Sequence, residues 1–185
     1  MTGDRTEGKR NADMDGQIVI MEGRPEDAAA VIAFTKKAGS ETNNLTFGAE
    51  GLEVTPEQEA LFLQQMSENL RAVFLCAWKD GKLVGTGFIS GMTKRMKHRA
   101  RLAISVLKSE WNKGVGSMLM EKMIEFAKET GAEIIELEVR SDNKRAIHLY
   151  EKYGFRRIGT FPGFFKIDGE YIDFELMCLD MRAQE

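Results

Sequence analysis

The chain has 185 residues, of which 43% are hydrophobic and 30% are charged, and its formal net charge is -3. Such a composition is typical of a globular protein with a sizeable core, and the slight acidity argues against a nucleic-acid-binding surface. No stretch approaches the ~18 apolar residues of a membrane span. The chain has only two histidines, which lie far apart in the sequence and therefore argue against a metal site. We therefore expect a cytoplasmic protein with no metal and with neither a membrane nor a nucleic acid as its partner.

The chain divides into a polar leader and one folded domain. Residues 1–16 carry almost no apolar side chains and are expected to be a disordered leader or an extension added for expression, whereas 17–185 form a single domain. In chain order we expect a strand at 17–21, helices at 28–37 and 55–71, strands at 72–78, 82–90 and 98–107, a helix at 114–130, a strand at 133–140, a helix from about 143 to 153, and strands at 155–167 and 171–181. This order predicts an α/β fold, a mixed sheet with helices packed on it.

Short turn signals separate several of these elements. Asp80-Gly81 and Asp168-Gly169 each predict a hairpin, and Gly131 and Gly154 are expected to end helices. Thr55 followed by Pro56 is a typical helix start. The two cysteines, Cys76 and Cys178, lie in apolar runs and are expected to be buried free thiols.

A glycine turn between a strand and an amphipathic helix is the most informative feature. The strand at about 101–107 leads into Gly114-Val115-Gly116, and apolar residues recur at helical spacing afterwards. Glycines allow a close approach of the backbone, and the first N–H groups of a helix have no partner within it. The turn is therefore expected to hold a phosphate group.

The segment after residue 141 supplies a second pattern. On a helix that begins near Asn143, the side chains of Asn143, Ala146, Ile147 and Tyr150 share one stripe. Such a face suits a slender ligand with a phenol at its reactive end. The alternative is a core stripe in which Tyr150 hydrogen-bonds to the backbone.

Together these motifs resemble those of the Gcn5-related N-acetyltransferase (GNAT) superfamily. The family's motif [RQ]-x-x-G-x-[GA] falls on 111–116, with Trp111 in the place usually held by arginine or glutamine. Its second motif falls on Asn143, Ala146, Tyr150, Gly154 and Phe155. The C-terminal hairpin is similar to the branch that contains ribosomal-protein and spermidine N-acetyltransferases.

The resemblance implies a fold and an activity. The expected fold is a central, mostly antiparallel sheet of about seven strands, splayed between the fourth and fifth, with about four helices. The expected activity is direct transfer of an acetyl group from acetyl-CoA to a primary amine of a small molecule or a peptide N-terminus. A non-catalytic acetyl-CoA sensor and a nucleotide-binding protein are the alternatives. Dimers are common in the superfamily, so a homodimer is one expected assembly.

The resemblance also implies roles for single residues. The pyrophosphate of CoA would bind at the turn, and the pantetheine arm would pair with the backbone of the preceding strand and run past the next helix. The cofactor-binding residues are then Ser105, Val106, Asn112, Lys113, Gly114, Val115, Gly116, Ser117, Asn143, Ala146 and Tyr150. Tyr150 would protonate the departing thiolate, and the Val106 N–H would polarise the thioester carbonyl.

The general base is less well defined by the sequence. The strand before the turn, at 98–106, offers no carboxylate, so Glu138 on the neighbouring strand is the candidate, with Glu41, Glu175 or an ordered water as alternatives.

Two charged segments each have two interpretations. Glutamates at 50, 53, 57 and 59 could attract a cationic amine or form a solvated helix face, and the basic segment 93–101 could contact phosphate or solvent.

Overall fold

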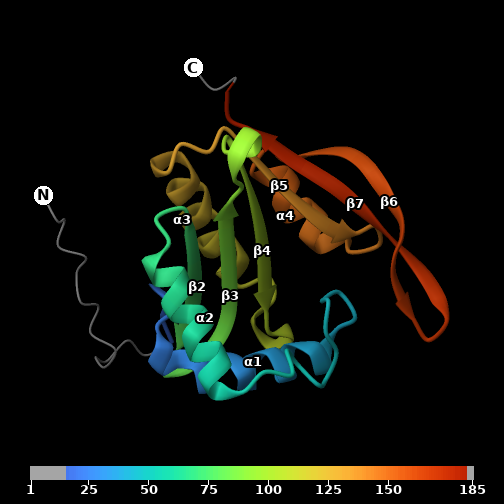
Figure 1. Ribbon diagram of the computed structural model, residues 1–185. Helices are drawn as coiled ribbons and strands as arrows, with labels where there is room; N and C mark the ends of the chain where they lie inside the picture. Colours follow the sequence, from blue (N-terminus) through green and yellow to red (C-terminus); the bar gives the residue numbers. More distant parts are fainter. Residues whose placement is uncertain (1–15, 183–185) are drawn as a thin grey trace, which may run out of the picture.

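Seven strands form one sheet in the computed structural model, which describes residues 16–182 (Figure 1). The strands are β1 (Ile18–Glu22), β2 (Ala72–Lys79), β3 (Lys82–Gly91), β4 (Arg99–Val106), β5 (Ile134–Arg140), β6 (Arg156–Ile167) and β7 (Glu170–Asp180), and their order in the sheet is β1-β2-β3-β4-β5-β7-β6. The helices are α1 (Ala28–Glu41), α2 (Pro56–Glu68), α3 (Val115–Glu129) and α4 (Lys144–Lys152), with short 3-10 turns η1 (Pro25–Asp27), η2 (Lys94–Met96) and η3 (Lys108–Glu110). Apart from Gly16, the expected leader lies outside the described residues.

The sheet opens between β4 and β5. These two strands are parallel and pair only over Arg99–Arg101 with Ile134–Glu136, whereas every other neighbouring pair is antiparallel. Beyond Arg101 the strands diverge, while β5 continues beside β7 to Arg140. The predicted mixed sheet, mostly antiparallel and splayed between the fourth and fifth strands, is confirmed.

Helices cover both faces of the sheet, and the side chains of β2 alternate between the two cores that the helices form with it. Val73, Leu75 and Ala77 belong to the large core beneath α3 and α4, whereas Cys76 belongs to a smaller core with residues of α1 and α2. The alternation follows from the twofold periodicity of a strand. Figure 1 shows α1 and α2 on the near face of the sheet and α3 behind it.

Two glycines of β3 set how closely α3 approaches the sheet. A Cβ atom at Gly85 would lie 3.0 Å from Val115, and one at Gly87 would lie 3.2 Å from Met123. Both glycines and both facing side chains are buried. The glycines therefore seat α3, and with it the glycine turn, directly against the middle of the sheet.

Two helices end at residues other than those predicted from the sequence. α1 continues past Lys37 to Glu41, because Gly39 provides room for a neighbouring loop: a Cβ atom there would lie 1.8 Å from the carbonyl oxygen of Gly48. α2 ends at Glu68 instead of near 71, where the Asn69 side chain accepts a hydrogen bond from the Arg71 N–H at 2.9 Å and forms a turn.

Some expectations about the surface are corrected. Cys76 is buried as expected, but Cys178 is only half-buried, and no disulfide joins the two. Glu59, grouped with a solvated helix face, is buried, and its Oε1 atom has no hydrogen-bond partner among the described residues. Burial raises the pKa of Glu59.

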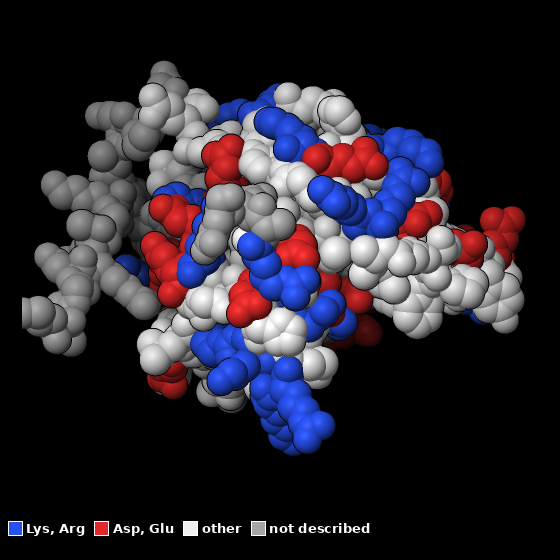
Figure 2. All heavy atoms as spheres, turned by 90° about the horizontal axis from the view of Figure 1, so that it is seen from above, with Lys and Arg blue, Asp and Glu red and all other residues white. Residues whose placement is uncertain are grey.

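The basic segment 93–101 is solvated at one end and paired at the other. Lys94, Arg95 and Lys97 are exposed around η2, while Arg99 and Arg101 form ion pairs with Glu136. Figure 2, which shows this end of the sheet from above, has Lys and Arg intermixed with Asp and Glu. Within residues 16–182 no helix is long and apolar enough to cross a membrane.

The contact between Gly39 and Gly48 gives a stability prediction. Replacing glycine by alanine inside a helix normally stabilises it by roughly 1 kcal/mol. Gly39→Ala should instead lower the free energy of unfolding by about 1–3 kcal/mol, because the methyl group would overlap the Gly48 carbonyl. Urea denaturation measures the change, and Ser40→Ala on the exposed side of the same turn is the control. A Gly39→Ala protein as stable as the wild type would contradict the packing described.

Candidate active site

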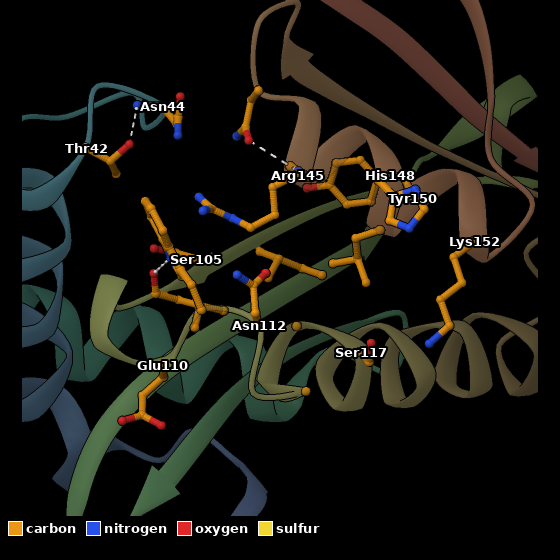
Figure 3. Close-up of a pocket in the computed structure, with 18 of the residues that line it drawn as sticks. Thr42, Asn44, Ser105, Glu110, Asn112, Ser117, Arg145, His148, Tyr150 and Lys152 are labelled. Atoms are coloured by element: carbon orange, nitrogen blue, oxygen red, sulfur yellow. Dashed lines mark hydrogen bonds between the residues drawn. The ribbon is translucent and has the colours of Figure 1, made fainter.

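A cavity of about 490 Å³ lies where β4 and β5 separate (Figure 3). Its walls come from four parts of the chain: the end of β4 and the turn after it, the start of α3, one face of α4, and the loop between α1 and α2. The lining residues are Thr42, Asn44, Leu45, Ile104, Ser105, Val106, Glu110, Trp111, Asn112, Gly114, Gly116, Ser117, Asn143, Arg145, Ala146, His148, Leu149, Tyr150 and Lys152.

The edge of β4 that faces the cavity has free backbone groups. The Leu107 N–H donates to the Val84 carbonyl at 3.0 Å, so the odd-numbered residues of β4 turn their peptide groups toward β3. The peptide groups of Ile104 and Val106 therefore face the opening, where β5 no longer pairs with them. Ser105, expected to offer its backbone, instead lines the cavity while its peptide groups face β3.

The turn before α3 is shaped by two residues with positive φ. Asn112 has φ 61° and Gly114, the N-cap of α3, has φ 90°. The first backbone bond into α3 runs from the Met118 N–H to the Gly114 carbonyl at 3.0 Å, and among the described residues no side chain caps the helix. The three preceding N–H groups of α3 are thus left without a helical acceptor, and the helix dipole adds partial positive charge there.

The two glycines of this turn have different tasks. A Cβ atom at Gly116 would lie 3.0 Å from the Leu149 side chain, so this glycine lets α3 and α4 approach each other. A Cβ atom at Gly114 would meet no atom within 4 Å, and that glycine is needed for its backbone conformation. Both glycines line the cavity, and α4 therefore forms its opposite wall close to the N-terminus of α3.

Tyr150 brings the phenol of α4 to the cavity. The residue is 7% exposed and packs against Phe155, and burial raises the pKa of Tyr150 to about 12. Within residues 16–182 its hydroxyl has no hydrogen-bond partner, unlike the backbone-bonded tyrosine of the alternative interpretation. At neutral pH the phenol is therefore protonated and able to donate.

Asn143 begins α4 and has one polar atom in use. Its side-chain oxygen accepts a hydrogen bond from the Ala146 N–H at 3.2 Å, which makes it the N-cap. The amide nitrogen is the remaining polar group of a side chain that lines the cavity. Ala146 lines the same wall and leaves the space next to Asn143 open.

Trp111 links the turn, the edge of β4 and α4. Its indole N–H donates to the Val106 carbonyl at 2.8 Å, and the Arg145 guanidinium carbon lies 3.3 Å from the centre of its ring. An arginine or glutamine at position 111 could not provide the same ring for a stacked guanidinium. The departure from the family motif thus replaces a polar side chain by a hydrogen-bonded stacking surface.

Glu110 is the carboxylate closest to this turn in the sequence, and it is neutralised. The residue is 8% exposed, and its oxygens lie 3.0 Å from Lys79 Nζ and 3.4 Å from Lys113 Nζ. The hydrogen bond from Lys79 lowers the pKa of Glu110. The Lys113 side chain therefore points to Glu110 and does not line the cavity.

The candidate bases are held by other partners. Glu138 lies 3.4 Å from Arg101 and does not line the cavity. The pKa of Glu41 is lowered overall. Burial alone would raise it, but the hydrogen bond from the Lys108 N–H at 2.7 Å and the nearby Lys37 together outweigh that effect. Glu175 accepts a hydrogen bond from Thr160 at 3.3 Å. None of these three carboxylates lines the cavity.

The structure therefore gathers most of the predicted residues. Of those named from the sequence, the cavity lining includes Ser105, Val106, Asn112, Gly114, Gly116, Ser117, Asn143, Ala146 and Tyr150. It does not include Lys113, Glu138 or Val115, whose side chain is fully buried under the sheet. Sequence reasoning missed Arg145, His148 and Lys152, although their spacing of three and four residues places them on one helical face. Among the described residues no group of three or more His, Cys, Asp or Glu could hold a metal ion.

Known proteins with the same features identify the class. The acetyltransferase (GNAT) family matches residues 41–155, and the chain belongs to this family. It is 35% identical over 130 residues to the L-amino acid N-acetyltransferase AaaT of Escherichia coli (strain K12), a match that covers 69% of this chain and 80% of that protein. The protein is thus an N-acetyltransferase.

Solved structures agree with this family assignment. The GNAT-family acetyltransferase from Streptococcus pneumoniae has a TM-score of 0.85 and 32% identity, over 89% of this chain and 99% of that one. The protein yncA from Salmonella typhimurium, solved with acetyl-CoA as its cofactor, has a TM-score of 0.77 and 18% identity, over 90% of this chain and 95% of that one. The second likeness shows the shared fold.

The burial of Tyr150 gives a spectroscopic prediction. The chain has three tyrosines, and Tyr171 is 71% exposed. In an alkaline titration followed by phenolate absorbance, Tyr150 should ionise near pH 12, because burial disfavours the phenolate. Tyr150→Phe should remove this late step and Tyr171→Phe should leave it in place, with circular dichroism confirming that the fold persists. Loss of an early step in Tyr150→Phe would show that the phenol is not buried.

Proposed function

We propose that the protein transfers the acetyl group of acetyl-CoA directly to a primary amine of a small molecule or a peptide N-terminus. The observation that carries this proposal is one cavity bounded by three features: the unpaired N–H groups that begin α3, the open edge of β4 and the buried phenol of Tyr150. A pyrophosphate fits the first feature, an extended amide chain fits the second and a leaving thiolate fits the third.

The turn and the strand would hold the donor in place. Acetyl-CoA supplies a thioester whose acetyl group is activated toward amines. The N–H groups of Val115, Gly116 and Ser117 would bind the pyrophosphate, with their positive partial charge already oriented. The free peptide groups of Ile104 would pair with the pantetheine arm as a neighbouring strand does.

Two groups of the chain would act on the reacting atoms. The Val106 N–H would donate to the carbonyl oxygen as negative charge develops there, and the Trp111 indole holds the adjoining Val106 carbonyl in place. Tyr150 would give its proton to the sulfur as the carbon–sulfur bond breaks. The amine nitrogen loses one proton when the new carbon–nitrogen bond forms, and this proton returns to Tyr150 through solvent, so the proton count balances.

Deprotonation of the amine is assigned to an ordered water at the cavity mouth. Glu138, the first candidate of the sequence, remains a proposal with a weaker basis, because its carboxylate is paired with Arg101. A water molecule needs only an exit path for the proton, and the cavity reaches the surface beside exposed residues such as Asn112. The role of Glu138 is tested by Glu138→Gln, for which we expect turnover within threefold of the wild type.

The loop between α1 and α2 supplies the acceptor side of the cavity. Thr42, Asn44 and Leu45 line the cavity from this loop. The start of this loop is fixed to both sides of the opening: Glu41 accepts from the Lys108 N–H at 2.7 Å, and Arg140 donates to the Asn43 carbonyl at 3.0 Å. The amine would enter beside this loop. AaaT is named for L-amino acids, so amino acids are the first acceptors to be assayed.

Tyr150→Phe tests the proton donor. The substitution keeps the ring and removes the hydroxyl, so turnover should fall at least about tenfold, as expected for loss of a general acid. The affinity for CoA should stay within about twofold. Thiol release from acetyl-CoA across a panel of amino acids, polyamines and peptide N-termini gives the rate, and calorimetry gives the affinity. Unchanged turnover would remove Tyr150 from the acid role.

Gly114→Glu tests the phosphate-binding turn. A glutamate there would strain a residue with φ 90° and place negative charge at the N-terminus of α3, so acetyl-CoA binding should be lost. Gly131→Glu is a matched control, because Gly131 also has positive φ (73°), also has open space at its Cβ, and lies just beyond the other end of α3. Equal binding by both variants in calorimetry would mean that the pyrophosphate binds elsewhere.

A further inference from the structure

The β6–β7 hairpin carries an exposed apolar surface at the edge of the sheet. β6 is the outermost strand and, with 12 residues, the longest one, and none of its residues is buried. Figure 1 shows the hairpin extending beyond the helices. Such a concentration of exposed apolar side chains on one element is typical of an interaction surface. Of the eight large apolar side chains exposed within residues 16–182, four lie on this hairpin: Ile158, Phe161, Phe164 and Tyr171.

The aromatic rings of the hairpin hold one another in place. Phe161 contacts Phe164 edge to face, with ring centres 5.0 Å apart, and Phe164 lies 4.6 Å from the ring of Phe174. Phe174 is buried, so the two exposed rings are anchored to a fixed one. Side chains that are already held lose little conformational freedom when a partner covers them.

The unpaired charges of the hairpin differ in sign between its two ends. Arg156 lies at the base of the hairpin, whereas Asp168 and Glu170 lie at its tip. Within residues 16–182 none of these three side chains forms an ion pair. The hairpin is therefore basic at its base and acidic at its tip, with the apolar surface between them.

Two hairpins placed antiparallel would match these ends. Residue 156 of one β6 would lie level with residue 167 of the other, and Glu170 is the cross-strand neighbour of Ile167. Each acidic tip would thus lie beside the basic base of the partner. The uncharged segment 158–165 would lie at the centre, opposite its own copy. A surface that is complementary to itself in this way meets the requirement of a twofold dimer.

The two like charges that this arrangement brings level already have partners. Arg157 of one β6 would lie level with Lys166 of the other. Arg157 lies 3.5 Å from Glu151 on α4, and Lys166 Nζ lies 5.1 Å from the centre of the Tyr171 ring. These contacts offset part of the repulsion between the two cations, so the unpaired charges determine the orientation.

Pro162 favours contact through side chains over a continuous sheet between two subunits. Proline has no N–H to donate to a neighbouring strand, and Pro162 lies in the middle of β6. The register of β6 with β7 also shifts between Phe161 and Phe165. The row of backbone groups that an edge strand offers is therefore interrupted, which disfavours open-ended strand addition and leaves the aromatic surface as the main contact.

We propose that two copies of this chain form a dimer through their β6 strands, antiparallel about a twofold axis near Phe161 and Pro162. The segment 158–165 would form the apolar centre of the interface, and Arg156 would pair with Glu170 of the partner at each end. The surface is separate from the candidate active site, since none of the residues that line the cavity lies on the hairpin. A parallel arrangement would instead place equal charges side by side at both ends.

Sedimentation equilibrium tests the dimer. The wild-type protein should sediment at twice the mass of one chain, which is 20.8 kDa, at micromolar concentrations. Phe161→Glu should weaken the dimer at least about thirtyfold, because it removes a central apolar contact twice in each dimer. Leu61→Glu is the matched control, because Leu61 on α2 is 55% exposed and Phe161 is 49% exposed, and this variant should dimerise as the wild type does. A monomeric wild type, or equal behaviour of the two variants, would overturn the proposal.

Charge reversal tests the orientation. Arg156→Glu and Glu170→Lys should each weaken the dimer about threefold to tenfold, because each places like charges together at both ends of the interface. The double variant should restore association to the wild-type level. Single variants without effect, or a double variant weaker than either one, would overturn the antiparallel arrangement. Circular dichroism confirms folding, and if Phe161→Glu does not fold, the charge-reversal series decides alone.

Discussion

The separation of β4 from β5 after only three paired residues is the constraint on which the site depends. Arg99 and Arg101 pair with Glu136 at the closed end, and β5 is then held by β7 along its whole length. β4 stays with β3, so the two strands are drawn to different partners and must part. The parting leaves the peptide groups of Ile104 and the N–H of Val106 without a neighbouring strand, and unpaired backbone groups at a sheet edge favour an added extended segment. A ligand with amide groups is the natural occupant.

The α3 turn and α4 complete this opening because glycines allow close packing. Gly85 and Gly87 seat α3 on the sheet, and Gly116 lets α4 approach α3. The N-terminus of α3 is thereby held next to the open strand edge, with positive partial charge toward the cavity. Trp111 then ties the turn to β4 through the Val106 carbonyl and carries Arg145 on its ring. Strand edge, turn and helix thus form the walls of one cavity.

Much of this arrangement was predictable because it depends on local chemistry. Asp80 and Gly81 both have positive φ, as their hairpin turn requires, and Gly114 has a positive φ that glycine adopts without strain. The periodicity of α4 placed Tyr150 on the same face as Asn143 and Ala146, and all three line the cavity. Contacts between distant residues were not predictable: the stacking of Arg145 on Trp111 joins positions 34 apart, and the pairing of Glu138 with Arg101 joins two strands. The extension of α1 depended on the fit of Gly39 to Gly48, which no local pattern reveals.

Amide hydrogen exchange with and without acetyl-CoA tests the central claim most directly. The claim is that the donor lies along the open edge of β4 with its pyrophosphate on the turn of α3. Saturating acetyl-CoA should slow exchange at Ile104 and Val106, and at Val115, Gly116 and Ser117, while the β2–β3 hairpin exchanges as before. Protection elsewhere, with these five amides unchanged, would contradict the claim.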